Sequence, residues 1–156
     1  MSKKKPLIVF EGIEGTGKTT LINYISRYLK KKNINFIKIR EPGGNRNSEL
    51  IRKLILNKNN KFNSFTDLML YFAARSENVE KIINKHYGKE IILIDRFTDS
   101  TLAYQHYGMK LDKLLINRIN RILLKRIKPH ITFLNLVNEK NLKKRLNIRK
   151  NKNRYD

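Results

Sequence analysis

Residues 10–20 read FEGIEGTGKTT, and this stretch decides the fold. Gly12 and the run Gly17-Lys18-Thr19 fit the phosphate-loop pattern, in which Gly is followed by four residues and then by Gly-Lys-Thr. The apolar run at residues 7–10 predicts a buried strand before the loop, and the helical spacing after it predicts a helix over 17–32. The strand–loop–helix context therefore indicates a site for a nucleoside triphosphate.

The chemistry of this site follows from its residue types. Glycines let the backbone turn tightly, so that successive N–H groups point at one anion, and the N-terminus of the next helix adds positive charge. Lys18 can reach the outer phosphates, and the hydroxyl of Thr19 can hold Mg²⁺. Asp95 ends the apolar run at 91–95, where a phosphate-loop protein needs a carboxylate to order magnesium and its waters. Thr19 and Asp95 are thus the predicted magnesium site.

A second anion site is indicated directly after that strand. Arg96 follows Asp95, and a guanidinium binds a phosphate through two parallel hydrogen bonds. Arg96 is therefore suited to an acceptor phosphate, with an ordinary surface ion pair as the alternative.

The whole chain has the pattern of one α/β domain. Apolar runs predict strands over 6–11, 33–39, 91–95 and 131–136. Between and after them, helices are expected over 17–32, 48–57, from 64 to about 86, around 111–123 and over 139–149, with Ser64 or Thr66 capping the third. This alternation predicts a doubly wound parallel sheet flanked by helices, with ligands at the carboxyl ends of the strands.

Composition limits the other possibilities. The 156 residues include no cysteine, which excludes disulfides and suits a reducing compartment, and no segment is long enough to span a membrane. We expect a cytoplasmic protein with no membrane partner. The net charge of +22 raises the possibility of nucleic-acid binding. However, the basic residues are spread over every segment, so we expect no specific nucleic-acid partner, only weak, salt-sensitive binding to polyanions.

Four motifs occur in one order along the chain. They are residues 11–20, REPGG at 40–44, YFAAR at 71–75 and DRFTDSTLAYQ at 95–105. Together they resemble the thymidylate kinase family, whose enzymes make dTDP from dTMP and ATP in dTTP biosynthesis. The resemblance runs from about residue 6 to the end. It implies one phosphate-loop kinase domain of the nucleoside monophosphate kinase type over 1–156, and a homodimer.

The same resemblance implies roles for individual residues. The phosphate loop would hold ATP through Gly12, Ile13, Glu14, Gly15, Thr16, Gly17, Lys18 and Thr19. The residues implied for dTMP are Glu14, Arg40, Pro42, Tyr71, Arg75, Arg96, Ser100, Thr101 and Tyr104. Among these, Tyr71 would stack on thymine and Arg75 would bond a thymine carbonyl. Core packing is the alternative for Tyr71 and Tyr104.

The resemblance also implies a mobile basic lid, here about 143–156. Thr16 stands where some members carry a catalytic arginine, so the positive charge must come from Arg145, Arg149 and Arg154. For Arg145 a solvated basic tail is an equal alternative. The implied catalytic set is Lys18, Asp95, Arg96, Arg149 and Arg154, which would act by positioning and charge neutralisation with Mg²⁺.

The chain departs from the family chiefly in length. Members continue well beyond residue 156 with a further strand and a final helix, and that part helps hold adenine. We therefore expect the strand at 131–136 to be an unprotected edge. Two other readings stay open: a truncated, catalytically impaired basic protein that binds nucleotides or polyanions, and a phosphate-loop kinase with a different acceptor.

Overall fold

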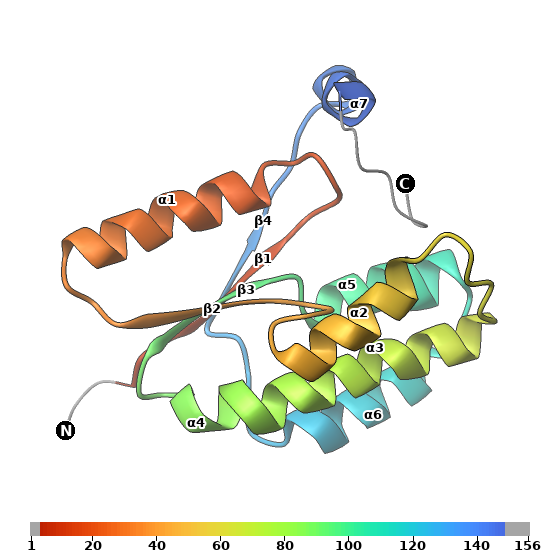
Figure 1. The fold of residues 1–156 in the computed structure, drawn as a ribbon, viewed down its shortest axis with the longest axis horizontal. Helices are drawn as coiled ribbons and strands as arrows, with labels where there is room; N and C mark the ends of the chain where they lie inside the picture. Colours follow the sequence, from red (N-terminus) through yellow and green to blue (C-terminus); the bar gives the residue numbers. More distant parts are fainter. Residues whose placement is uncertain (1–3, 149–156) are drawn as a thin grey trace.

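The protein has a four-stranded parallel sheet in a computed structural model that describes residues 4–148. The strands are β1 (Leu7–Glu11), β2 (Phe36–Arg40), β3 (Ile91–Asp95) and β4 (Ile131–Leu134), and their order in the sheet is β2-β3-β1-β4 (Figure 1). Each neighbouring pair is parallel, with Leu7 beside Ile92 and Ile8 beside Ile131. The predicted α/β class with a parallel sheet flanked by helices is confirmed.

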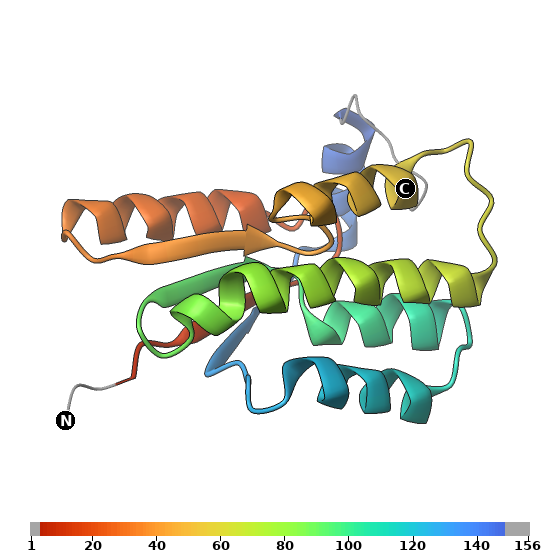
Figure 2. The same ribbon diagram turned by 60° about the horizontal axis from the view of Figure 1, so that its bottom comes forward.

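Helical segments connect the strands. They are α1 (Lys18–Lys31), α2 (Arg46–Leu56), α3 (Ser64–Asn78), α4 (Asn84–His86), α5 (Thr98–Thr101), α6 (Lys113–Leu124) and α7 (Glu139–Ile148), together with the π-helical segments η1 (Val79–Ile83) and η2 (Leu102–Gly108). In Figures 1 and 2, α1 lies on one side of the sheet, whereas α3, α4 and α6 lie on the other. Because helices lie on both faces of the sheet, a ligand is expected at the carboxyl ends of the strands.

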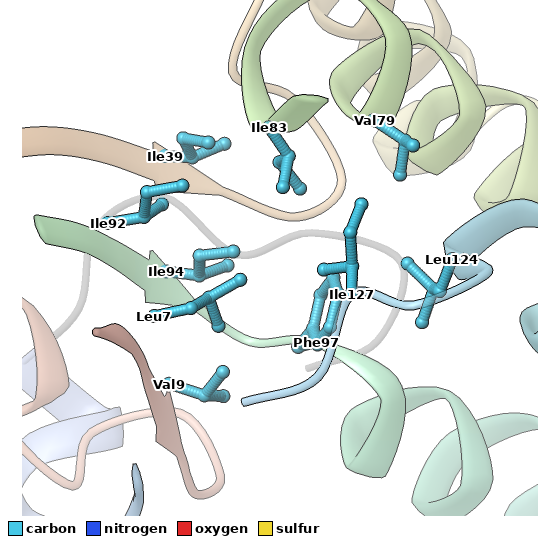
Figure 3. Packing of buried hydrophobic residues seen from close by; sticks show 10 residues of the cluster. All are labelled: Leu7, Val9, Ile39, Val79, Ile83, Ile92, Ile94, Phe97, Leu124 and Ile127. Atoms are coloured by element: carbon cyan, nitrogen blue, oxygen red, sulfur yellow. The ribbon is translucent and has the colours of Figure 1, made fainter. Parts of the chain in front are cut away.

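Alternation along the strands builds two cores. Leu7 and Val9 face the α3 side, where they join Ile92 and Ile94 and meet residues of η1 and α6 (Figure 3). Phe10 and Leu93 face the opposite side and pack against Ile22 and Leu29 of α1. Because successive side chains of a strand point to opposite faces, a strand that is apolar throughout must be covered on both. This requirement fixes the sheet inside the molecule.

One local prediction was wrong, and one helical segment was missed. The cap of α3 is Asn63, whose side-chain oxygen accepts a hydrogen bond from Thr66 N at 2.8 Å, rather than Ser64 or Thr66. The continuous helical segment over 98–108 was not expected at all. The helix from residue 64 to residue 86 is confirmed, because α3, η1 and α4 follow one another without a break.

The outer strand β4 is open to solvent. All four of its residues are exposed, and within residues 4–148 its outward edge pairs with no other strand. The predicted unprotected edge is therefore confirmed for the described part of the chain. No helix in the same range is long and apolar enough to cross a membrane.

Candidate active site

The loop between β1 and α1 has the backbone geometry of an anion cradle. Gly12, Gly15 and Gly17 have φ angles of 135°, 78° and 91°, which residues with a Cβ atom rarely adopt. A Cβ atom at Gly12 would lie 2.5 Å from the backbone oxygen of Asn135, so no larger residue fits there without a shift. The loop opens into a cavity of about 900 Å³ that also contacts Arg40, Asp95 and Arg96.

Lys18 and Asp95 are the titratable groups at the base of this cavity. Lys18 is buried, and its Nζ donates to the backbone oxygens of Gly12 at 2.8 Å and Ile13 at 3.0 Å. Burial, reinforced by Arg96, lowers the pKa of Lys18. Burial raises the pKa of Asp95, although Lys18 and Arg96 oppose the shift. The two side chains are thus a desolvated cation and a desolvated anion whose charges stabilise each other.

The predicted magnesium residues lie in this cavity. Thr19 and Asp95 both line it, and both also line a separate cavity beside β2. The Oδ1 atom of Asp95 is buried and has no hydrogen-bond partner within residues 4–148. A buried carboxylate oxygen without a donor is unusual, because burial normally requires a partner. The oxygen is therefore suited to accept a hydrogen bond from a water that a hydrated cation holds.

A second, narrower cavity of about 60 Å³ adjoins the first. It brings together eight of the nine residues implied for dTMP: Glu14, Pro42, Tyr71, Arg75, Arg96, Ser100, Thr101 and Tyr104. The ninth, Arg40, instead lines the wide cavity and forms an exposed ion pair with Glu49 at 2.9 Å. The two cavities share four lining residues, Arg96 among them, so they lie side by side.

Arg96 stands between the two cavities. Its guanidinium donates to Glu14 Oε1 at 2.9 Å and to Ser100 Oγ at 3.3 Å, and lies 5.4 Å from the centre of the Tyr104 ring. Burial alone would lower the pKa of Arg96, but Tyr104 and Glu14 outweigh it and raise the pKa. This guanidinium therefore remains charged where an anion could reach it from either side.

Arg75 forms the floor of the narrow cavity. Only 2% of its surface is exposed, and it donates to Glu41 at 2.7 Å, Asn120 at 2.6 Å and Thr101 at 2.9 Å. Burial raises the pKa of Glu41, while Arg75 opposes that rise. Partners from β2's end, α5 and α6 therefore fix the guanidinium in one position.

Two residues of the site were missed from the sequence. Arg52 of α2 lines both cavities and donates to the backbone oxygen of Pro42 at 2.6 Å. Gln105 lines the narrow cavity, is 1% exposed, and has neither side-chain polar atom hydrogen-bonded within the described residues. The signal for Gln105 was present, since it ends the motif at 95–105. Arg52 carried none, because it lies outside all four motifs.

Helix α7 lies near the phosphate loop (Figure 1) and contacts it. Arg145 donates through Nη1 to the backbone oxygen of Gly15 at 2.9 Å, and Leu142 would lie 3.3 Å from a Cβ at Gly15. Of the three lid arginines, Arg145 is thus beside the loop, whereas Arg149 and Arg154 lie outside the described residues. The predicted lid over 143–156 is described only as far as residue 148.

Comparison with known proteins shows the family to which the chain belongs. Residues 10–156 match the family profile described as Thymidylate kinase. The chain is 45% identical over 154 residues to thymidylate kinase of Prochlorococcus marinus (strain MIT 9515), covering 93% of this chain and 73% of the relative. It is 41% identical over 129 residues to that of Sulfurihydrogenibium sp. (strain YO3AOP1), covering 81% of this chain and 63% of the relative.

A solved structure shares the fold. The crystal structure of thymidylate kinase from Ehrlichia chaffeensis superposes with a TM-score of 0.80 at 37% identity, over 92% of this chain and 78% of that one. The chain spans between 57% and 73% of the length of the curated relatives compared with it. The sequence matches and the shared fold together place the chain in the thymidylate kinase family, the nucleotide kinases of dTTP biosynthesis.

Proposed function

We propose that this chain transfers the γ-phosphoryl group of ATP to dTMP and so forms dTDP. One observation carries the proposal: a glycine-built cradle with Lys18 and a narrow pocket floored by Arg75 meet at shared charged side chains, Arg96 and Arg52 among them. Phosphoryl transfer needs two phosphates held in line with their charge neutralised, and little covalent chemistry. The proposed arrangement would hold both phosphates and neutralise their charge.

On the donor side, residues 12–19 would hold the triphosphate of ATP. The backbone N–H groups and Lys18 would neutralise the outer phosphates. Thr19 and Asp95 would hold hydrated Mg²⁺, which when bound neutralises charge on the β- and γ-phosphates. The orphaned, buried oxygen of Asp95 supports this assignment.

On the acceptor side, Arg96 and Arg52 would bind the phosphate of dTMP, because both guanidinium groups line the passage between the cavities. Arg75 and Gln105 would face the polar edge of thymine, and Tyr71 would stack on its ring. Glu14 would bond the sugar, with Ser100, Thr101 and Tyr104 closing around base and deoxyribose. Arg40 and Pro42 would form the neighbouring wall. The two unpartnered atoms of Gln105 support a ligand with both a donor and an acceptor.

The lid would complete the charge around the transferred group. Arg145 already contacts the phosphate loop, which supports its assignment over a solvated tail. Arg149 and Arg154 stay predictions. Closure of such a segment excludes water and so limits hydrolysis of ATP.

A coupled assay of ADP release tests the proposal. The full chain is assayed with ATP, Mg²⁺ and either dTMP, dUMP, dCMP or no acceptor. We expect the highest kcat/KM with dTMP and a weaker reaction with dUMP, because loss of one methyl contact changes discrimination by about 1–3 kcal/mol. A rate with dTMP no higher than the rate without acceptor would contradict a kinase activity for this chain.

The exposed strand β4 favours a second candidate, a binding protein with impaired turnover. Calorimetric titration separates the two. Binding of both ATP and dTMP without ADP release would support the second candidate and exclude the first.

A homodimer is the proposed assembly. Exposed apolar side chains lie on the outer surfaces of three helices: Leu50 and Leu54 on α2, Phe65 on α3, and Leu114 and Ile122 on α6. Burial of such surface against a second copy would remove it from water. Light scattering after size exclusion should give twice the chain mass, and Leu54→Glu should give a monomer. The proposed location remains the cytoplasm.

A further inference from the structure

Glu11 is a buried carboxylate that contacts neither nucleotide cavity. It is the last residue of β1, directly before the phosphate loop, and only 4% of its surface is exposed. Its oxygens accept hydrogen bonds from Phe97 N at 2.8 Å, Ser100 N at 3.3 Å and Ser100 Oγ at 2.5 Å. All three hydrogen-bond donor groups belong to residues that follow Arg96. One side chain at the end of β1 therefore holds the start of the helical segment 98–108.

The backbone at Arg96 needs this support. Its φ of 66° lies in the left-handed region, which is unfavourable for a residue with a Cβ atom. The residues after it begin the helical segment 98–108, whose first N–H groups have no acceptor within the helix. Glu11 accepts from two N–H groups at this start, Phe97 and Ser100. The carboxylate thereby stabilises the turn from which the Arg96 side chain projects.

Ser100 links these hydrogen bonds to the guanidinium of Arg96. Its hydroxyl has one proton, which it donates to Glu11. The oxygen is then available as an acceptor for Arg96 Nη1 at 3.3 Å. A chain of hydrogen bonds therefore runs from Glu11 through Ser100 to Arg96.

We propose that Glu11 is a positioning residue that fixes Arg96 and so sets the contribution of the acceptor phosphate to binding. The inference rests on the proposed function, in which Arg96 binds that phosphate. Glu11 acts through Arg96 and Ser100 and touches neither substrate. Loss of Glu11 should therefore weaken binding of the phosphate group and leave binding of the nucleoside intact.

The test compares dTMP with thymidine, which lacks only the phosphate. The dissociation constants of both are measured by calorimetry on the full chain, and their ratio, thymidine over dTMP, reports the contribution of the phosphate. Glu11→Gln keeps the shape but places an amide NH₂ group against a hydroxyl that donated to a carboxylate. We expect the ratio to fall roughly 10-fold, with the thymidine constant changed less than about 2-fold.

Glu41→Gln is the matched control, because it alters the other buried glutamate, which faces Arg75 under the base. This variant should weaken thymidine and dTMP equally and leave the ratio unchanged. An unchanged ratio in Glu11→Gln, or equal weakening of both ligands, would overturn the positioning role. If Glu11→Gln does not fold, Ser100→Ala decides: it breaks the same chain, and the ratio should fall about 3-fold or the proposal is wrong.

Arg96→Ala separates this inference from the proposed function. It should reduce the ratio to about that expected without a phosphate contact. If Arg96→Ala leaves the ratio intact, the proposed acceptor site is wrong; if only Glu11→Gln leaves it intact, the positioning role alone is wrong.

Discussion

The proposed donor and acceptor sides of the site are built in different ways. The donor side consists mainly of backbone, with three glycines at positive φ and a wide cavity. The acceptor side consists of side chains, several of them fully buried and held by partners from distant parts of the chain. A triphosphate needs only converging N–H groups and cations, whereas a particular base needs fixed donors and acceptors. Substrate selectivity is therefore expected to reside on the acceptor side.

Lys18→Met should have the largest effect of the proposed variants. It should impair the donor side and leave the acceptor side unaffected. Loss of the cation at the transferred phosphates should lower kcat on the order of 10³-fold, as for other groups that stabilise transition-state charge. Affinity for dTMP should change less than about 2-fold, because Lys18 does not line the narrow cavity. The coupled assay and calorimetry measure the two. A comparable loss of dTMP affinity would mean that the two sides are not separable.

Arg75→Met should chiefly lower the free energy of unfolding. Removing one partner of a buried ion pair leaves Glu41 uncompensated, so we expect a loss of about 3 kcal/mol in the free energy of unfolding by urea. Arg40→Met is the matched control, because its pair with Glu49 is exposed and should contribute less than about 1 kcal/mol. Equal losses in the two variants would show that the acceptor floor is not a desolvated pair.

The contrast between local backbone patterns and contacts over long sequence distances explains which features could be predicted from the sequence. The phosphate loop and the strands were predicted because adjacent residues determine them: glycines at fixed spacing, and apolar runs covered on both faces. The segment 98–108 was missed because Thr98, Asp99 and Ser100 are typical of turns, and its start depends on Glu11, which is 86 residues away from Phe97.

The acceptor residues were predicted only through resemblance. No local pattern indicates that Arg75 of α3 meets Asn120 of α6, because the contact spans 45 residues and depends on how the helices pack. Arg52 was missed for the same reason, since it reaches the site only once α2 is placed beside Pro42.

Asp95→Asn should separate activity from stability. Activity should fall roughly 10- to 100-fold, as when a group that orients a metal's ligands is lost. The folded-state pKa of Asp95 is raised above its unfolded value by burial, so the folded protein loses stability as pH rises through that pKa. Asn carries no charge, so the variant should have the higher Tm at neutral pH.

The pH dependence provides the check on Asp95→Asn. The difference in Tm between variant and wild type should shrink as pH falls below the ordinary pKa of aspartate, where both states are protonated. Asp99→Asn, at an exposed carboxylate, is the control for the loss of one negative charge. A variant less stable than wild type at neutral pH would contradict the role of burial.

Arg145→Ala should have the smallest effect of the series. A hydrogen bond from a charged group contributes about 1.5 kcal/mol, so kcat should fall about 10-fold with dTMP affinity unchanged. Lys144→Ala, at the neighbouring exposed residue of α7, is the control. An unchanged kcat in Arg145→Ala would mean that the positive charge needed for phosphoryl transfer does not come from Arg145.

The outer edge of β4, which pairs with no strand within residues 4–148, has a consequence for aggregation. Its sequence, Ile-Thr-Phe-Leu, is uncharged and favours extended structure, so it is a template on which another molecule's strand could add. A net charge of +22 opposes such encounters at low ionic strength, because like-charged molecules repel. Added salt shortens the range of that repulsion to about 10 Å at 0.1 M. Turbidity of concentrated solutions should therefore grow faster in salt, the reverse of the salting-in usual for a strongly basic protein.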